Sequence, residues 1–155
     1  MKRPITFVLA AVMLLCLAAC GKEEVKQMDM AKVYEKITQQ VTMPQMLELD
    51  ADLMLDYCGI YAEDVKQAVV VICSDGITAD EIWLLEAKDA DSAKRLMETA
   101  QKRLDKKAEE QKNYSAEQYA VVQKGILEQH GNYIALLVSP DVETMAKIFR
   151  QEAGV

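Results

Sequence analysis

The stretch Ala68-Val69-Val70-Val71-Ile72-Cys73 is the clearest strand signal in this chain. Its β-branched residues predict a buried strand, because such side chains suit a pleated backbone. A loop begins at Ser74-Asp75-Gly76, and residues 81–88 predict a second strand through Ile82-Trp83-Leu84-Leu85. The two strands are therefore expected to form an antiparallel hairpin with a long connection.

A second hairpin is expected nearer the C-terminus. Residues 126–130 and 133–138 predict strands, and Gly131-Asn132 between them suits a two-residue hairpin turn. The two hairpins together predict a four-stranded antiparallel sheet.

Apolar residues recur at helical intervals in five segments around these strands. Capping residues such as Asp29, and Asp89 or Asp91, mark helix starts, and Ser115 with Gln118 forms a capping box. The expected helices are 29–41, 50–59, 89–112, 115–122 and 139–154. The element order is α-α-β-β-α-α-β-β-α, which predicts a single α+β domain over residues 29–155 packed around the sheet.

The first twenty residues predict export and lipid attachment. A positive start at Lys2 and Arg3 is followed by an apolar run over residues 5–17, which is shorter than the ~20 residues of a membrane-spanning helix. The run Leu17-Ala18-Ala19-Cys20 resembles the bacterial lipobox, in which the cysteine thiol takes a diacylglyceryl group and cleavage occurs just before it. The alternative is an ordinary secretory signal that ends by chance at a cysteine.

This interpretation divides the N-terminal part of the chain into two segments. Residues 1–19 are expected to be a lipoprotein signal peptide, and residues 20–28 a lipidated cysteine with a short tether. Two acyl chains on Cys20 would hold the protein stably at the outer, extracytoplasmic face of the cell membrane.

The charge of the domain is strongly acidic. Removal of Lys2 and Arg3 with the signal leaves 16 basic residues against 25 acidic ones, a formal charge of −9. An acidic surface repels nucleic acid and anionic headgroups. We therefore expect no nucleic-acid partner, and contact with the membrane through the lipid on Cys20 alone.

Several side chains could in principle carry chemistry, but none belongs to a recognisable constellation. They are acidic residues at a helix start, acidic residues around the first hairpin loop, and the single histidine: Asp50, Asp52 and Asp56; Asp75, Asp80 and Glu81; and His130. The first group lacks the glycine turn and distal glutamate of a calcium loop. The second could act as acid and base, but its neighbours are turn formers. The sequence thus predicts no catalytic residue, no metal site and no cofactor.

The predicted strands are apolar on both faces. Either helices cover both sides of the sheet, or one face stays open for a partner, a lipid or a second copy. Trp83 is the candidate partner-binding residue if a face is open. Cys58 and Cys73 are expected to be buried thiols, with a single disulfide as the alternative in an exported compartment.

The mature chain, from about Val33 to Phe149, resembles a family of small lipoproteins from Gram-positive, clostridia-type bacteria that carry a domain of unknown function. The motifs behind this resemblance are Asp56-Tyr57-Cys58-Gly59-Ile60, Asp80-Glu81-Ile82, Tyr114 and Gly131-Asn132-Tyr133-Ile134. The resemblance implies surface anchoring in a single-membrane cell, and it implies no activity and no functional residue. The family does not require a cysteine at the position of Cys58.

These features favour a non-catalytic binding or accessory module of the cell envelope, with an envelope protein as its partner. An envelope enzyme that uses loop carboxylates such as Asp75 and Glu81 is the first alternative. A self-associating structural lipoprotein is the second.

Overall fold

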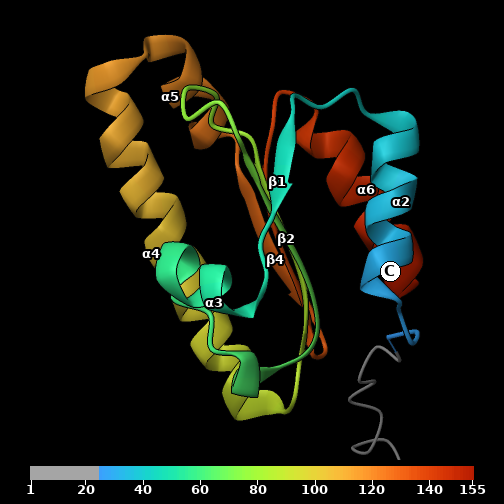
Figure 1. Ribbon diagram of the computed structural model, residues 1–155. Helices are drawn as coiled ribbons and strands as arrows, with labels where there is room; N and C mark the ends of the chain where they lie inside the picture. The colour runs from blue at the N-terminus through green and yellow to red at the C-terminus, as the bar shows by residue number, and fades with distance from the viewer. Residues whose placement is uncertain (1–24) are drawn as a thin grey trace, which may run out of the picture.

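The computed structural model describes residues 25–155, in which helices flank a central antiparallel sheet (Figure 1). The predicted signal peptide 1–19 and the predicted lipidation site Cys20 lie outside the described residues. The α-helices within the described part are α2 (Met30–Gln40), α3 (Ala51–Leu53), α4 (Ala90–Tyr114), α5 (Ala116–Gln123) and α6 (Val142–Ala153). None of these helices has the length and apolar character needed to cross a membrane.

The sheet contains both predicted hairpins. Its strands in the described part are β1 (Met46–Glu48), β2 (Val65–Cys73), β3 (Glu81–Ala87), β4 (Ile126–His130) and β5 (Tyr133–Val138). Their order is β1-β2-β3-β5-β4, and every neighbouring pair is antiparallel. The hairpins join through β3 and β5, where Leu84 lies opposite Ala135. The predicted α+β class is confirmed.

The expected number of four strands is wrong, because β1 adds a fifth strand at one edge. Met46 pairs with Cys73 and Glu48 with Val71. A backbone hydrogen bond from Leu49 to Val70 continues this pairing (2.9 Å). The free edge of the nine-residue β2 would otherwise leave a row of backbone groups unpaired. A strand of three residues is too short to show the alternation of apolar and polar residues, so the sequence does not predict β1.

The predicted helix at residues 50–59 has an unusual geometry. Asp50 caps α3 by accepting a hydrogen bond from the Leu53 amide (3.0 Å), and the chain then widens into the π-helix η2 (Met54–Cys58). A 3-10 turn, η3 (Ala62–Asp64), follows. The predicted end at Gly59 is confirmed: its φ of 71° is left-handed, and the Ile60 amide donates back to the Met54 carbonyl (3.2 Å).

Helices cover both faces of the sheet. The layer of α2 and α6 packs on one face, and the layer of α4, α5 and η2 packs on the other (Figure 1). Alternate residues of β3 serve the two layers, with Ile82 and Leu84 facing α2 and α6 and Trp83 facing α4. This arrangement explains why the strands are apolar on both faces.

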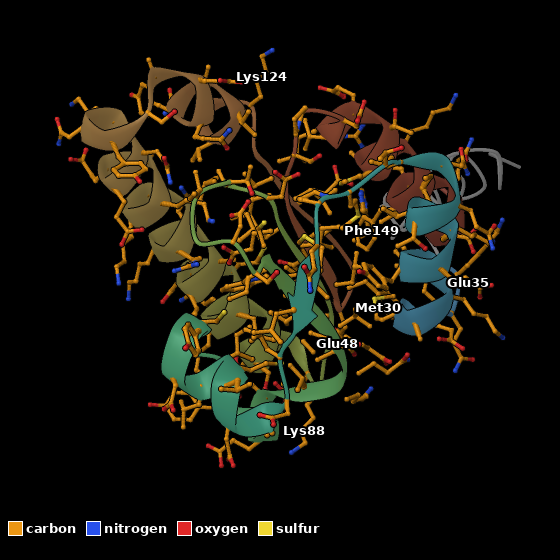
Figure 2. All side chains as sticks on the ribbon, turned by 45° about the horizontal axis from the view of Figure 1, so that its top comes forward. Met30, Glu35, Glu48, Lys88, Lys124 and Phe149 are labelled. Carbon is orange, nitrogen blue, oxygen red and sulfur yellow. The ribbon has the colours of Figure 1, made fainter. Side chains whose placement is uncertain are left out.

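The side chains also divide between the two faces of the sheet (Figure 2). Met30 and Phe149 lie between the sheet and the α2–α6 layer, whereas Glu35 projects outward from α2. The Met30 and Phe149 side chains are essentially buried. The core is therefore split into two halves by the sheet.

Part of the expected tether belongs to the folded domain. The Lys26 amide donates to the Ala153 carbonyl (3.0 Å), beside the end of α6. Met28 is buried, and its amide donates to the Tyr133 hydroxyl (3.2 Å). Residues 25–28 thus pack on the domain, and the described chain begins next to its own C-terminus (Figure 1).

Trp83 provides a test of the core assignment, because its side chain is 0% exposed. We expect Trp83→Ala to lower the free energy of unfolding by about 3–5 kcal/mol, since a large cavity would remain in the α4 half of the core. Urea denaturation measures this change. Tyr114→Ala, at a residue that is 71% exposed, serves as the control and should change the value by less than about 0.5 kcal/mol. Equal stability of both variants would contradict the core position of Trp83.

Candidate functional site

A cavity of about 330 Å³ lies between the end of η2 and the middle of α4. We call it the η2–α4 pocket, and its lining residues are Tyr57, Cys58, Gly59, Thr99, Lys102, Arg103 and Lys106. The four residues from α4 follow a spacing of three and four, so they occupy one face of the helix. Three of these four carry a positive charge.

The opposite wall of the pocket depends on the local geometry of η2. The π-turn ends at Gly59, whose left-handed backbone with positive φ favours glycine. A Cβ atom at this position would lie 3.7 Å from the Thr99 Cγ2 atom, which is an ordinary contact. The backbone conformation, rather than lack of space, therefore selects glycine here. Single π-turns of this kind occur frequently at functional sites.

A buried ion cluster forms the support beneath the pocket. The Glu81 carboxylate is completely buried and accepts hydrogen bonds from Arg103 Nε (2.9 Å) and Nη2 (2.8 Å). Trp83 Nε1 donates to the same carboxylate (2.8 Å), and Lys107 Nζ lies 3.0 Å from it. Lys107 also donates to the Ala79 carbonyl (3.0 Å). These contacts fix the position of α4 on β3.

The charge state of Glu81 follows from this environment. Burial opposes ionisation, but the hydrogen bonds and charges of Arg103 and Lys107 outweigh it and hold the pKa of Glu81 below its usual value. Glu81 is therefore an ionised structural anion whose oxygens already have donors. It does not have the exposure or the free lone pairs that a general base needs.

The other two loop carboxylates also have structural partners. Asp75 accepts hydrogen bonds from the amides of Ile77 (2.7 Å) and Thr78 (2.9 Å), which stabilise the turn and hold the pKa of Asp75 well below its usual range. Burial raises the pKa of Asp80, and a hydrogen bond with Ser139 partly offsets this effect. The structure gives these residues separate roles and does not gather them around a pocket.

Cys58 lines the pocket as a neutral thiol. Burial, reinforced by the negative charge of Glu81, raises the pKa of Cys58 to about 12, although Arg103 and Lys107 oppose this shift. A thiol in this state is a poor nucleophile and a poor metal ligand at neutral pH. Cys58 and Cys73 are both buried and neither forms a disulfide, so the expectation of two buried thiols is confirmed.

The single histidine lies on the other side of the sheet from Cys58. The His130 ring packs against Phe149 of α6, with 5.8 Å between the ring centroids. Glu128 lies near it and pairs with Arg150 (2.8 Å). His130 therefore does not meet a cysteine, and within residues 25–155 no set of three metal-ligating side chains comes together. Of the acidic group at the helix start, Asp50 caps α3 and Asp52 and Asp56 are exposed.

Trp83, the candidate partner-binding residue, takes no part in any surface. Its ring fills the core beneath α4, and its indole nitrogen is occupied by Glu81. The binding role depended on an open sheet face, and α4 covers that face.

A second cavity, of about 550 Å³, lies between the C-terminal end of α2 and the edge strand β1. It is lined by Tyr34, Thr38, Gln39, Gln40, Val41, Thr42, Met43, Pro44 and Met46. No charged side chain lines it, so its electrostatics do not select a class of ligand. The η2–α4 pocket is the more informative site.

Sequence reasoning did not identify Lys102, Arg103 and Lys106 as a site. The spacing of these residues gives one detectable signal, because like charges three and four positions apart gather on one helix face. The second wall, at Tyr57 to Gly59, is more than forty residues away and only the fold brings it close.

The protein is thus an α+β domain with a five-stranded antiparallel sheet in its described part, helices on both faces and a basic pocket between η2 and α4. The chain belongs to the family described as "Domain of unknown function (DUF4358)", whose model matches residues 39–139. The matched region contains the whole sheet and both walls of the η2–α4 pocket. Searches of curated proteins and of solved structures found no match.

The resemblance expected from the sequence is therefore confirmed for the domain of unknown function. Its lipoprotein and clostridial parts stay predictions.

Glu81 gives a testable pH dependence. Its pKa is lower in the folded state, so its ionised form stabilises the fold above the unfolded-state pKa of about 4.5, and this contribution is lost as the pH falls further. Glu81→Gln removes the charge and leaves Arg103 and Lys107 without their partner, which we expect to cost about 3–5 kcal/mol at pH 7.

Urea denaturation between pH 7 and pH 3 tests this expectation. The difference in stability between wild type and Glu81→Gln should shrink below about pH 4.5, because protonated Glu81 resembles glutamine. A difference that stays constant down to pH 3 would show that Glu81 is not the stabilising anion.

Proposed function

We propose that this protein is a lipid-anchored binding or accessory module of the cell envelope, held at the outer face of the membrane through Cys20. The anchor rests on the sequence: the positive start, the apolar run over residues 5–17 and Leu17-Ala18-Ala19-Cys20 occur in the right order. Two acyl chains on one cysteine give stable attachment. The partner is an envelope component and not a nucleic acid, in keeping with the acidic composition.

The arrangement of the domain is compatible with this anchoring. Cys20 precedes Val25 by five residues, which allows a span of at most about 18 Å. The bilayer would then lie near the end of α6, where Lys26 meets Ala153. Helix α4 lies on the other face of the sheet from α6 (Figure 1), and the η2–α4 pocket that it lines would stay accessible to a ligand.

The observation that best supports a binding function is the chemistry of the residues that line the η2–α4 pocket. Its residues provide positive charge and an aromatic side chain, but the nearby carboxylate of Glu81 is fully paired and the Cys58 thiol is protonated. A pocket with charge and no reactive group favours binding over catalysis.

The anchor is tested by fractionation of cells that express single-cysteine variants. Wild type should sediment with membranes and incorporate labelled palmitate, whereas Cys20→Ala should do neither. Cys16→Ala is the matched control, because that cysteine lies inside the predicted signal peptide and its loss should change nothing. Membrane retention and labelling of Cys20→Ala would refute the lipid anchor at this position.

The accessory function is tested by cross-linking in intact cells, followed by purification through a tag after Val155. The anchored protein should recover a specific envelope component that the Cys20→Ala form does not recover. If the anchored form recovers only itself, a self-associating lipoprotein becomes the better description.

A further inference from the structure

The geometry points to a phosphate-bearing ligand as the occupant of the η2–α4 pocket. We infer that Lys102, Lys106 and the unused edge of the Arg103 guanidinium bind its phosphate group. This inference rests on the proposed binding function and specifies the chemistry of its ligand.

Lys102 and Lys106 make no close ion pair that would stabilise the described part of the fold. Lys102 has no ion-pair partner among the described residues, and the contact of Lys106 is with the exposed Glu110 at 3.8 Å. Lysines four positions apart on a helix repel each other, which is a small but unfavourable effect. In a chain with a formal charge of −7, two such lysines beside an arginine indicate a site for an anion.

Arg103 supplies a donor that is already oriented. Its Nε and Nη2 atoms bind Glu81, which fixes the plane of the guanidinium. Its Nη1 atom makes no hydrogen bond within residues 25–155, and the side chain, which lines the pocket, is 16% exposed. A donor held in place before the ligand arrives loses little conformational entropy on binding.

The charge around the pocket remains positive after internal pairing. Arg103 and Lys107 together place two positive charges around the single negative charge of Glu81. Lys102 and Lys106 add two more positive charges at the opening, and the exposed Glu110, 3.8 Å from the Lys106 ammonium, offsets only one of them. The neutral thiol of Cys58 contributes no negative charge that would repel an anion.

A phosphate group matches this arrangement better than a carboxylate does. Its tetrahedral oxygens offer separate acceptors to three donors that approach from one helix face, whereas a carboxylate offers two oxygens in one plane. Tyr57 is 55% exposed at the rim, where its ring can contact the organic part of a phosphate ester. A soluble phosphate compound and a phospholipid headgroup share this chemistry.

The test is a calorimetric titration of the full-length protein in nonionic detergent with inorganic pyrophosphate at low salt. Lys102→Gln/Lys106→Gln should weaken binding about tenfold or more, because two charge-assisted contacts are lost. Lys112→Gln/Lys124→Gln removes the same charge at exposed positions outside the pocket and should leave affinity within about twofold. Thermal unfolding of both variants checks that the fold is intact.

Two further probes distinguish the ligand class and its source. Citrate, at equal charge, should bind more weakly than pyrophosphate. Glycerophosphoglycerol, the soluble headgroup of phosphatidylglycerol, identifies a lipid source if it binds more tightly than pyrophosphate and loses affinity in the Lys102→Gln/Lys106→Gln variant.

The inference is overturned if neither phosphate probe binds, if citrate binds as tightly, or if the two lysine variants weaken binding equally. None of these results would affect the Cys20 fractionation, so failure of the ligand assignment is distinct from failure of the proposed anchoring.

Discussion

Strand β3 is buried on both of its faces, and the rest of the domain is arranged to satisfy this requirement. Ile82 and Leu84 are buried by packing against α2 and α6, and Trp83 is buried by packing against α4. The same strand carries the charge of Glu81 into the core, where it is tolerable only with donors around it. Helix α4 meets both demands, because its apolar face packs on the sheet while Arg103 and Lys107 reach Glu81. The position of α4 in turn sets one wall of the η2–α4 pocket.

Much of this architecture could be predicted from local sequence signals. The β-branched run at residues 68–73, the Gly131-Asn132 turn and the caps at Asp29, Asp89 and Ser115 each act over a few residues, and the structure contains the corresponding elements. Strand β1 could not be predicted, because it forms only where the edge of β2 offers partners. The pairing of β3 with β5 is likewise a contact between distant segments, which a periodic pattern does not encode.

The site was harder to predict than the fold. From the sequence, Glu81 has the neighbours of a loop carboxylate, and these do not reveal that Arg103 and Lys107, about one turn apart on a later helix, will neutralise it. Trp83 is a candidate surface residue from the sequence for the same reason, because the sequence pattern alone does not show which helices cover a strand. The basic residues of α4 form a pocket only because the fold places η2 opposite them. Family membership adds no activity to this description, so the chemistry of the pocket is the main guide to function.

The two ends of the described chain meet where Lys26 is hydrogen-bonded to Ala153. Within residues 25–155, the first and last residues of the backbone therefore lie at one place on the domain. Such a unit can be appended to a leader, or inserted into a surface loop of another protein, with little disturbance of either partner. Under the proposed anchoring through Cys20, rotation about the short segment before Val25 would present different sides of the domain to its surroundings.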